Sequence, residues 1–285
     1  MKKLKMIFLL FLLTSIIYAQ TDMRVEKFDI DGTLTVNDPI SEDLGRINAV
    51  QFNFNEGDKF YSELTADFFP MLVLVAPSGE YNIRYPEKGE RSAIFDETIK
   101  ESGQWLLYIV GDSSDTGNYH LMNIYASASS LQFNDSLSFC EKLQLLLLHD
   151  KANFYFLRGN PTDEEAQSWE AKIAISDLGK GMIYGSDMSA YKNLLFKTDV
   201  KELSEEKMND FSSKIENCLS SDWEKIEGKW QNLVGSENIK QKKIAFVERG
   251  NENRYVKLTE MEISTDGFPN IFYKIEIIVS RKELK

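Results

Sequence analysis

Hydrophobic and polar residues alternate with a period of two through most of residues 24–126. Val50, Phe52 and Phe54 alternate with polar residues, and the alternation returns at residues 60–66 after a polar turn. Alternate side chains of a strand lie on one face of its sheet, so the pattern predicts strands with one buried face. The first two runs are expected to form a hairpin. The expected strands cover residues 50–54, 60–66, 71–75, 81–85, 92–99, 105–110 and 119–125.

The period changes after a small, polar segment at residues 128–136, which we interpret as a linker. Apolar residues then recur at intervals of three and four, which predicts a helix over about residues 136–149. Ser138 and Glu141 fit a capping box at its start.

A second helix is expected to begin after a cap at Ser204, because Met208, Phe211, Ile215 and Leu219 form one apolar stripe. Strand patterns surround the two helices, and the last two are expected to pair as a hairpin. Helices on one face of an antiparallel sheet give an α+β domain. The expected strands cover residues 154–157, 171–175, 181–184, 193–197, 243–248, 255–263 and 271–279.

The 285 residues are therefore expected to form two domains. Residues 24–127 form an all-β, jelly-roll-like sandwich, and residues 137–285 form an α+β domain with an antiparallel sheet and two main helices.

Several groups of residues in the first domain occur in a characteristic order. They are Gly32-Thr33-Leu34, residues 47–54 with Glu56-Gly57, residues 67–74 with Pro77-Ser78-Gly79, and residues 103–110 followed by residues 116–121. Their order over residues 26–127 resembles the bacterial pre-peptidase C-terminal (PPC) family, a small jelly-roll sandwich beside the catalytic domains of exported proteins. The resemblance implies an exported, non-catalytic module. The second domain resembles no family that we recognise.

The first nineteen residues have the features of a secretory signal peptide. Lys2, Lys3 and Lys5 precede an apolar run at residues 6–17, and Ala19 is the expected last residue before cleavage. The run has only about a dozen residues, too few for a transmembrane anchor. We therefore expect a periplasmic or extracellular protein without a membrane anchor.

The chain is strongly acidic, with 33 Lys and Arg residues against 45 Asp and Glu residues. Removal of the signal peptide leaves 30 basic residues against the same 45 acidic ones. Such a surface repels nucleic acid, so we expect no nucleic-acid partner. Cationic partners and divalent metals remain open, and so does a surface that is merely well solvated.

The two cysteines, Cys140 and Cys218, both lie in the second domain. In an exported protein an even pair indicates a disulfide, although buried thiols remain an alternative because both residues lie on apolar helix stripes. Catalysis by Cys140 with His149 is disfavoured, since nine helical residues separate them by about 13 Å along the axis.

Residues 28–34 spell FDIDGTL, in which Asp29 and Asp31 imitate the nucleophile and acid/base of a phosphohydrolase. Asp112 and Asp115 would then belong to its metal-binding loop. That chemistry requires a parallel sheet with helical crossovers, whereas the intervening residues alternate as antiparallel strands. We interpret the motif as a chance match, and expect no enzyme. A secreted hydrolase, with this motif or with an unrecognised site in the second domain, is the alternative.

Residues 103–126 are interpreted as a hairpin whose turn contains Asp112, Asp115 and Asn118. Their oxygen ligands suit calcium, the only cofactor considered, but the same residue types also serve a tight turn. Four tyrosines of the first domain could instead offer a platform to a sugar, or pack in the core. The expected function is non-catalytic binding of a protein or carbohydrate ligand. The tyrosines are Tyr81, Tyr85, Tyr119 and Tyr125.

Overall fold

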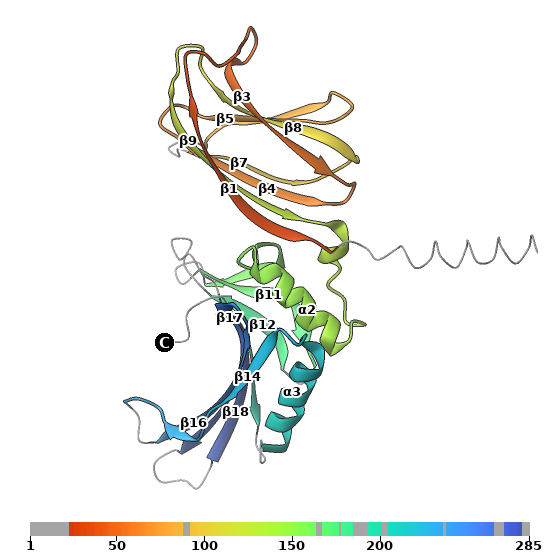
Figure 1. Cartoon of the computed structure of the whole chain (residues 1–285), viewed down its shortest axis with the longest axis vertical. Helices are drawn as coiled ribbons and strands as arrows, with labels where there is room; N and C mark the ends of the chain where they lie inside the picture. Colours follow the sequence, from red (N-terminus) through yellow and green to blue (C-terminus); the bar gives the residue numbers. More distant parts are fainter. Residues whose placement is uncertain are drawn as a thin grey trace, which may run out of the picture. The chain divides into compact units, whose positions relative to one another are not determined.

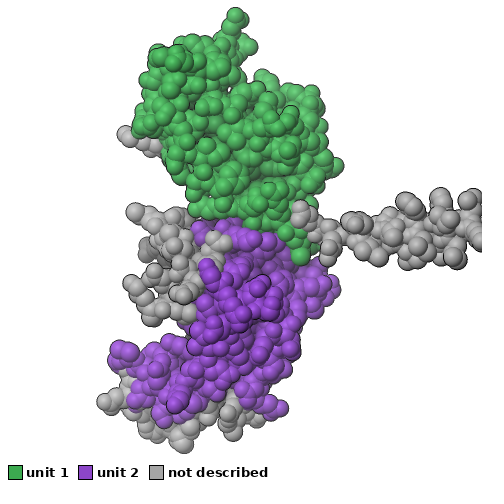
Figure 2. Space-filling view, in the orientation of Figure 1, with its two compact units in different colours: residues 1–132 green, residues 133–285 purple. Residues whose placement is uncertain are grey.

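The computed structural model describes residues 23–87, 92–163, 167–176, 178–184, 193–200, 205–235, 238–264 and 271–280. The chain divides into two compact units, residues 1–132 and residues 133–285 (Figures 1 and 2). The predicted signal peptide and the Ser204 cap lie outside the described residues.

The elements of unit 1 are almost all strands. They are β1 (Val25–Leu34), β2 (Ile40–Ser41), β3 (Gly45–Phe54), β4 (Lys59–Ala66), β5 (Met71–Val75), β6 (Tyr81–Arg84), β7 (Ser92–Thr98), β8 (Gly103–Gly111), β9 (Gly117–Ala126) and the short 3-10 helix η1 (Ala128–Leu131).

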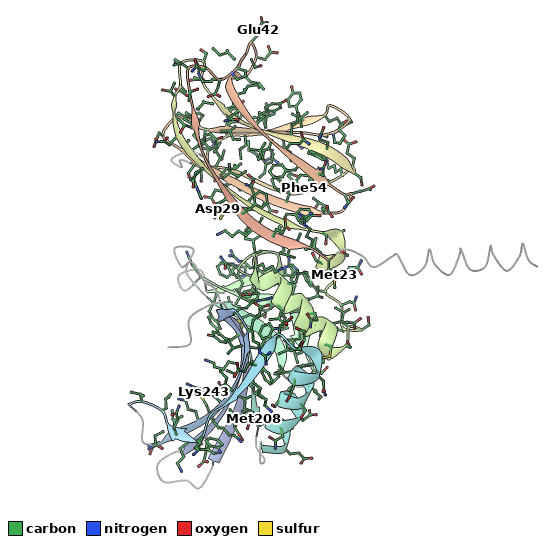
Figure 3. The ribbon with its side chains drawn as sticks, viewed as in Figure 1. Met23, Asp29, Glu42, Phe54, Met208 and Lys243 are labelled. Atoms are coloured by element: carbon green, nitrogen blue, oxygen red, sulfur yellow. A yellow bond between two sulfur atoms is a disulfide. The ribbon has the colours of Figure 1, made fainter. Side chains whose placement is uncertain are left out.

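Unit 1 is a β-sandwich, as the alternating pattern predicts. One antiparallel sheet has the strand order β1-β9-β4-β7, and the other has the order β2-β3-β8-β5-β6. The core lies between them, and the side chain of Phe54 enters it (Figure 3). The rings of Phe54 and Phe60 come from different sheets, and their centroids are 4.9 Å apart. Burial of these aromatic side chains is a main source of the sandwich's stability.

The two hairpins expected in unit 1 do not form. β3 and β4 belong to different sheets, and so do β8 and β9. β8 pairs with β3 and β5, while β9 pairs with β1 and β4. The turns at residues 55–58 and 112–116 therefore cross from one sheet to the other. Alternation of hydrophobic residues shows only that one face of a strand is buried, and it does not specify the partner strand.

Unit 2 contains two α-helices and one large antiparallel sheet among its described residues. The strand order is β10-β11-β12-β13-β18-β17-β16-β14, and β15 also pairs with β16. The expected pairing of the last two strands is confirmed. The elements are α2 (Phe139–Asp150), η2 (Tyr155–Leu157), β10 (Arg158–Asp163), β11 (Ser168–Ile175), β12 (Gly179–Tyr184), β13 (Asn193–Val200), α3 (Glu205–Cys218), β14 (Trp223–Glu227), β15 (Gln231–Asn232), β16 (Ile239–Glu248), β17 (Asn251–Ser264) and β18 (Ile271–Ser280).

Both helices pack on one face of this sheet (Figure 1). Leu146 of α2 and Phe211 of α3 belong to the same core as Phe246 of β16 and Leu258 of β17. The predicted capping box at the start of α2 is confirmed, with Ser138 as the N-cap. Among the described residues, no helix is long and apolar enough to cross a membrane.

The prediction of a strand at residues 154–157 is wrong. The backbone N–H of Phe154 donates to the carbonyl of His149 at 2.9 Å, so the chain still bonds to the end of α2. Phe154 has a left-handed conformation, and residues 155–157 form the 3-10 helix η2. Strand β10 starts only at Arg158, within a polar segment that gave no strand pattern.

Candidate binding surface

One face of the sheet β1-β9-β4 is turned away from the sandwich core and carries polar side chains. Along β1 the exposed residues alternate with partly buried ones, which places Asp29 and Asp31 on this face. His120 of β9 is exposed on the same face, and β4 contributes Glu63 and Thr65. We call these five residues the acidic face.

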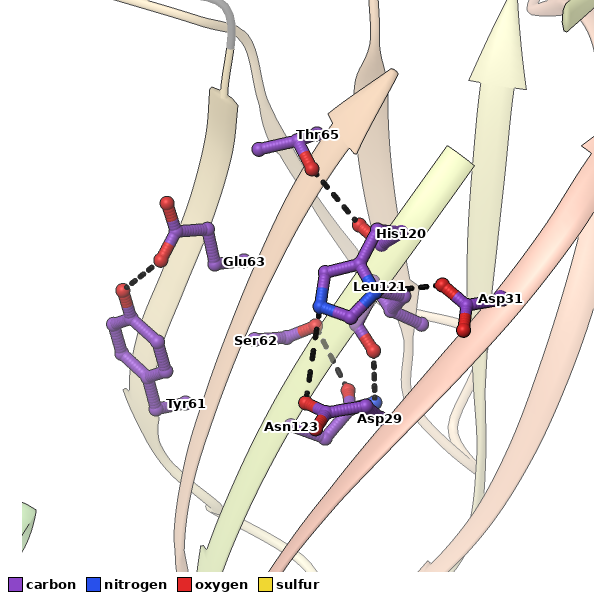
Figure 4. Close-up of polar contacts among 9 residues, drawn as sticks. All are labelled: Asp29, Asp31, Tyr61, Ser62, Glu63, Thr65, His120, Leu121 and Asn123. Carbon is purple, nitrogen blue, oxygen red and sulfur yellow. Dashed lines mark hydrogen bonds and ion pairs between the residues drawn. The ribbon is translucent and has the colours of Figure 1, made fainter. Parts of the chain in front are cut away.

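The strand register brings the acidic face together from distant parts of the sequence. Asp31 is paired with His120 across β1 and β9, and His120 is paired with Thr65 across β9 and β4. The Nδ1 atom of His120 lies 2.7 Å from the Oδ1 atom of Asp31, and its Nε2 atom lies 3.9 Å from the Oδ1 atom of Asp29 (Figure 4). A single exposed imidazole thus lies between two carboxylates.

These carboxylates are accessible to a ligand. The side chain of Asp31 is 85% exposed, and those of Asp29 and His120 are 46% and 48% exposed. The hydroxyl of Tyr61 donates a hydrogen bond to Glu63 at 2.9 Å, which orients that third carboxylate (Figure 4). Exposed ion pairs contribute little to stability, so this arrangement is not explained as a structural brace.

Within the described residues, the acidic face lacks the parts of a hydrolytic site. The hydroxyl of Thr65 is directed to the backbone carbonyl of His120 at 3.5 Å, not to its ring. Ser62 is buried on the opposite face of the sheet, where it donates to Asn123 at 2.9 Å. No group of three or more His, Cys, Asp or Glu side chains suited to a metal ion occurs among the described residues. The exposed carboxylates of the acidic face can accept hydrogen bonds and positive charge.

The phosphohydrolase-like string lies on β1, the edge strand of an antiparallel sheet. Its Gly32 has a packing role, since a Cβ atom there would lie 2.3 Å from the ring of Tyr119. Asp112 and Asp115 follow β8, which belongs to the other sheet. The string therefore occurs without the parallel sheet that its chemistry requires.

The polar side chains that follow β8 bond to other groups of the protein, and Asn118 lies in β9 rather than in the turn. A carboxylate oxygen of Asp115 accepts a hydrogen bond from the N–H of Asp112 at 2.9 Å. Asn118 accepts one from the hydroxyl of Thr33 at 2.9 Å, and its N–H donates to Asp67 at 3.1 Å. Calcium binding by Asp112, Asp115 and Asn118 stays a prediction.

The four tyrosines do not form one platform. Tyr119 and Tyr125 are in the core, whereas Tyr81 and Tyr85 are exposed. The hydroxyl of Tyr125 donates to Asp58 at 2.7 Å. Burial, together with the nearby Asp38 carboxylate, raises the pKa of Tyr119 above its ordinary value.

Unit 2 confirms the predicted disulfide between Cys140 and Cys218, which joins α2 to α3. Beside it, the side-chain amide of Gln144 donates to the carbonyl of Cys218 at 2.6 Å. Arg254 is nearly buried and contacts Asp150 at 3.1 Å and Glu248 at 2.9 Å. Arg254 also donates to a carbonyl of α2, so this cluster holds the helix against the sheet.

The contact of His120 with Asp31 escaped the sequence-based reasoning, because 89 residues separate the two. The alternation of charged residues along residues 25–33 was the available signal. It indicates that Asp29 and Asp31 share a face, but not which strand lies beside them.

No protein-family model matches the chain, and no curated protein matches it. A solved structure of the pre-peptidase C-terminal domain of collagenase from Bacillus anthracis is similar at 19% identity, with a TM-score of 0.27, over 34% of this chain and 89% of that chain. The periplasmic g-type lysozyme inhibitor PliG of Aeromonas hydrophila is similar at 8% identity, with a TM-score of 0.26, over 36% of this chain and 88% of that chain.

A tandem pair of CBM22 domains from Paenibacillus barcinonensis Xyn10C is similar at 9% identity, with a TM-score of 0.20, over 91% of this chain and 86% of that chain. The first match agrees with the PPC resemblance of residues 26–127.

Proposed function

We propose that the protein is an exported, two-domain binding protein that holds a cationic protein ligand, without catalysis, on the acidic face of its jelly-roll-like first domain. The observation that carries this proposal is the accessible group formed by Asp29, Asp31 and His120. Exposed carboxylates without a nucleophile or a metal-type cluster among the described residues suit recognition of ammonium or guanidinium groups.

The charge of the whole chain supports this class of ligand. The expected mature protein has 45 acidic against 30 basic residues, which attracts cations and repels polyanions at long range. The acidic face would convert this general attraction into a defined contact, since its carboxylates project from β1 and β4, the two strands that flank β9 in one sheet.

Carbohydrate is the second candidate ligand. Tyr81 is 64% exposed and lines a groove of about 340 Å³ that also contains Asn82 and Lys100. An exposed aromatic ring beside hydrogen-bonding side chains is a common arrangement in small-molecule sites. This groove lies on the other sheet, so variants of the acidic face would leave sugar binding unchanged.

The test titrates a fluorescein-labelled octalysine peptide with the mature protein, residues 20–285, and measures anisotropy at low salt. Substitution of Asp29→Asn together with Asp31→Asn is expected to weaken binding about fivefold, because two exposed carboxylates each contribute modestly to the attraction.

The matched control is Glu42→Gln with Asp43→Asn, two exposed residues between β2 and β3. It removes the same charge, so equal weakening by both double variants would mean diffuse attraction and would contradict the proposal. Turnover of p-nitrophenyl phosphate with Mg²⁺, abolished by Asp29→Asn, would favour the hydrolase alternative instead.

A further inference from the structure

Strand β1 has one side without a partner strand among the described residues, because it lies at the edge of its sheet. The backbone N–H of Ser127 donates to the carbonyl of Arg24 at 2.8 Å, in register with the β1–β9 ladder. Bonded and non-bonded pairs alternate along an antiparallel ladder. The N–H and C=O groups of Lys27, Asp29 and Asp31 therefore point away from β9, toward the open edge.

The two sides of this edge differ in chemistry. On the outer side, the side chains of Asp29 and Asp31 belong to the acidic face. On the inner side, a groove of about 240 Å³ lies between β1 and β3. Its lining residues include Phe28, Phe52 and Phe54, with Arg24, Gln51 and Asn53.

Aromatic rings line this groove. The ring of Phe28 on β1 lies 5.9 Å from the ring of Phe52 on β3, and Phe52 stacks on Phe54 at 5.4 Å. Phe28 and Phe52 are both only partly buried, so apolar surface is left for a ligand side chain. Within the described residues, β2 pairs only with Gly45 and Arg46 of β3, which leaves the groove uncovered by β2.

We infer that an extended peptide adds to β1 as a further antiparallel strand, and that its side chains alternate between Lys or Arg and apolar or aromatic residues. The cationic side chains lie beside Asp29 and Asp31, and the apolar ones enter the groove against Phe28 and Phe52. This inference rests on the proposed function, since it specifies the ligand of the acidic face.

Charge complementarity selects this occupant. Exposed edge strands usually carry charges that prevent pairing with other strands. On β1 the charges on the outer face are two carboxylates and one lysine, which repel an acidic strand and accept a basic one. A second copy of the chain would bring its own Asp29 and Asp31 to the same edge, where like charges would repel it.

The test uses an eight-residue peptide of alternating Lys and Val, fluorescein-labelled, acetylated and amidated, with the mature protein. In two further versions of this peptide, the backbone nitrogens of either all four lysines or all four valines are methylated. In an antiparallel added strand, residues whose side chains lie beside Asp29 direct their N–H groups toward β1. Methylation of the lysines is therefore expected to weaken binding roughly tenfold or more, and methylation of the valines to change it less than about twofold.

A charge exchange provides the second arm. A peptide of alternating Glu and Val is expected not to bind the natural protein, but to bind the Asp29→Lys, Asp31→Lys variant, once circular dichroism shows that the variant is folded. This exchange would show that side chains at these two positions select the strand.

Two outcomes overturn the inference while the proposed function stands. In the first, methylation of the lysines and methylation of the valines weaken peptide binding equally. In the second, the Lys-Val peptide shows no saturable binding while octalysine binding still depends on Asp29 and Asp31. Elution of the peptide-free protein as a dimer that dissociates on Asp29→Lys substitution would assign the edge to a second copy and also overturn it. Loss of both peptide binding and octalysine dependence would refute both proposals.

Discussion

At the scale of single residues, Asp58 shows how a turn residue organises unit 1. It is buried, and its carboxylate accepts hydrogen bonds from the N–H of Asn55 at 2.8 Å, the hydroxyl of Tyr125 at 2.7 Å and the N–H of Ala128 at 3.0 Å. Asp58 lies in the polar turn that the alternation pattern predicts between residues 54 and 60. Only the structure shows that it joins the turn between β3 and β4 to the segment after β9.

Asp58→Ala is expected to lower the free energy of unfolding of unit 1 by about 3 kcal/mol, because it leaves buried donors without an acceptor. Differential scanning calorimetry would measure the shift. Asp43→Ala, at an exposed position, serves as the control and should change stability by less than about 0.5 kcal/mol. Similar effects from the two variants would contradict the role given to Asp58.

At the scale of elements, the start of α2 is stabilised locally. The side chain of Ser138 accepts a hydrogen bond from the N–H of Glu141, and the Glu141 carboxylate accepts one from the N–H of Ser138 at 2.7 Å. Hydrogen bonds from the side chain and backbone of Ser138 lower the pKa of Glu141 below its ordinary 4.5. The folded state therefore favours the ionised carboxylate.

A lowered folded-state pKa implies a stabilising contribution that is present above pH 4.5 and is lost as the pH falls through the folded value. Wild type is therefore expected to be more stable than Glu141→Gln at pH 7, and the difference should shrink as the pH falls below 4.5. Urea unfolding at both pH values measures it. Glu42→Gln is the control, and a difference that grows on acidification would refute the assignment.

At the scale of the whole molecule, the covalent constraint belongs to one unit only. The disulfide joins Cys140 and Cys218, which are 78 positions apart within unit 2. A cross-link over this distance removes conformational freedom mainly from the unfolded chain, and in the chain-entropy treatment contributes about 4.5 kcal/mol. Unit 1 contains neither cysteine.

Reduction is therefore expected to lower the melting temperature of unit 2 and leave that of unit 1 unchanged. Calorimetry with and without dithiothreitol would show one transition moving, and Asp58→Ala should move the other. The Cys140→Ser, Cys218→Ser variant should reproduce the effect of reduction. A shift of both transitions together would mean that the two units unfold as one.

Much of the local structure follows from the sequence. Strand and helix periods, the capping box at Ser138 and the Cys140–Cys218 pair were all predictable, because each depends on neighbouring residues or on a single available partner. The exposure of Asp29 and Asp31 on one face of β1 also follows from a period of two.

In unit 1, strand pairing was decided only by the tertiary structure. The sequence could not indicate that β8 and β9 belong to different sheets, that His120 pairs with Asp31, or which of the four tyrosines enter the core. Alternation is a property of a few adjacent residues, whereas pairing depends on how all the buried faces pack together. The acidic face and the open edge of β1 therefore exist only in the folded sheet.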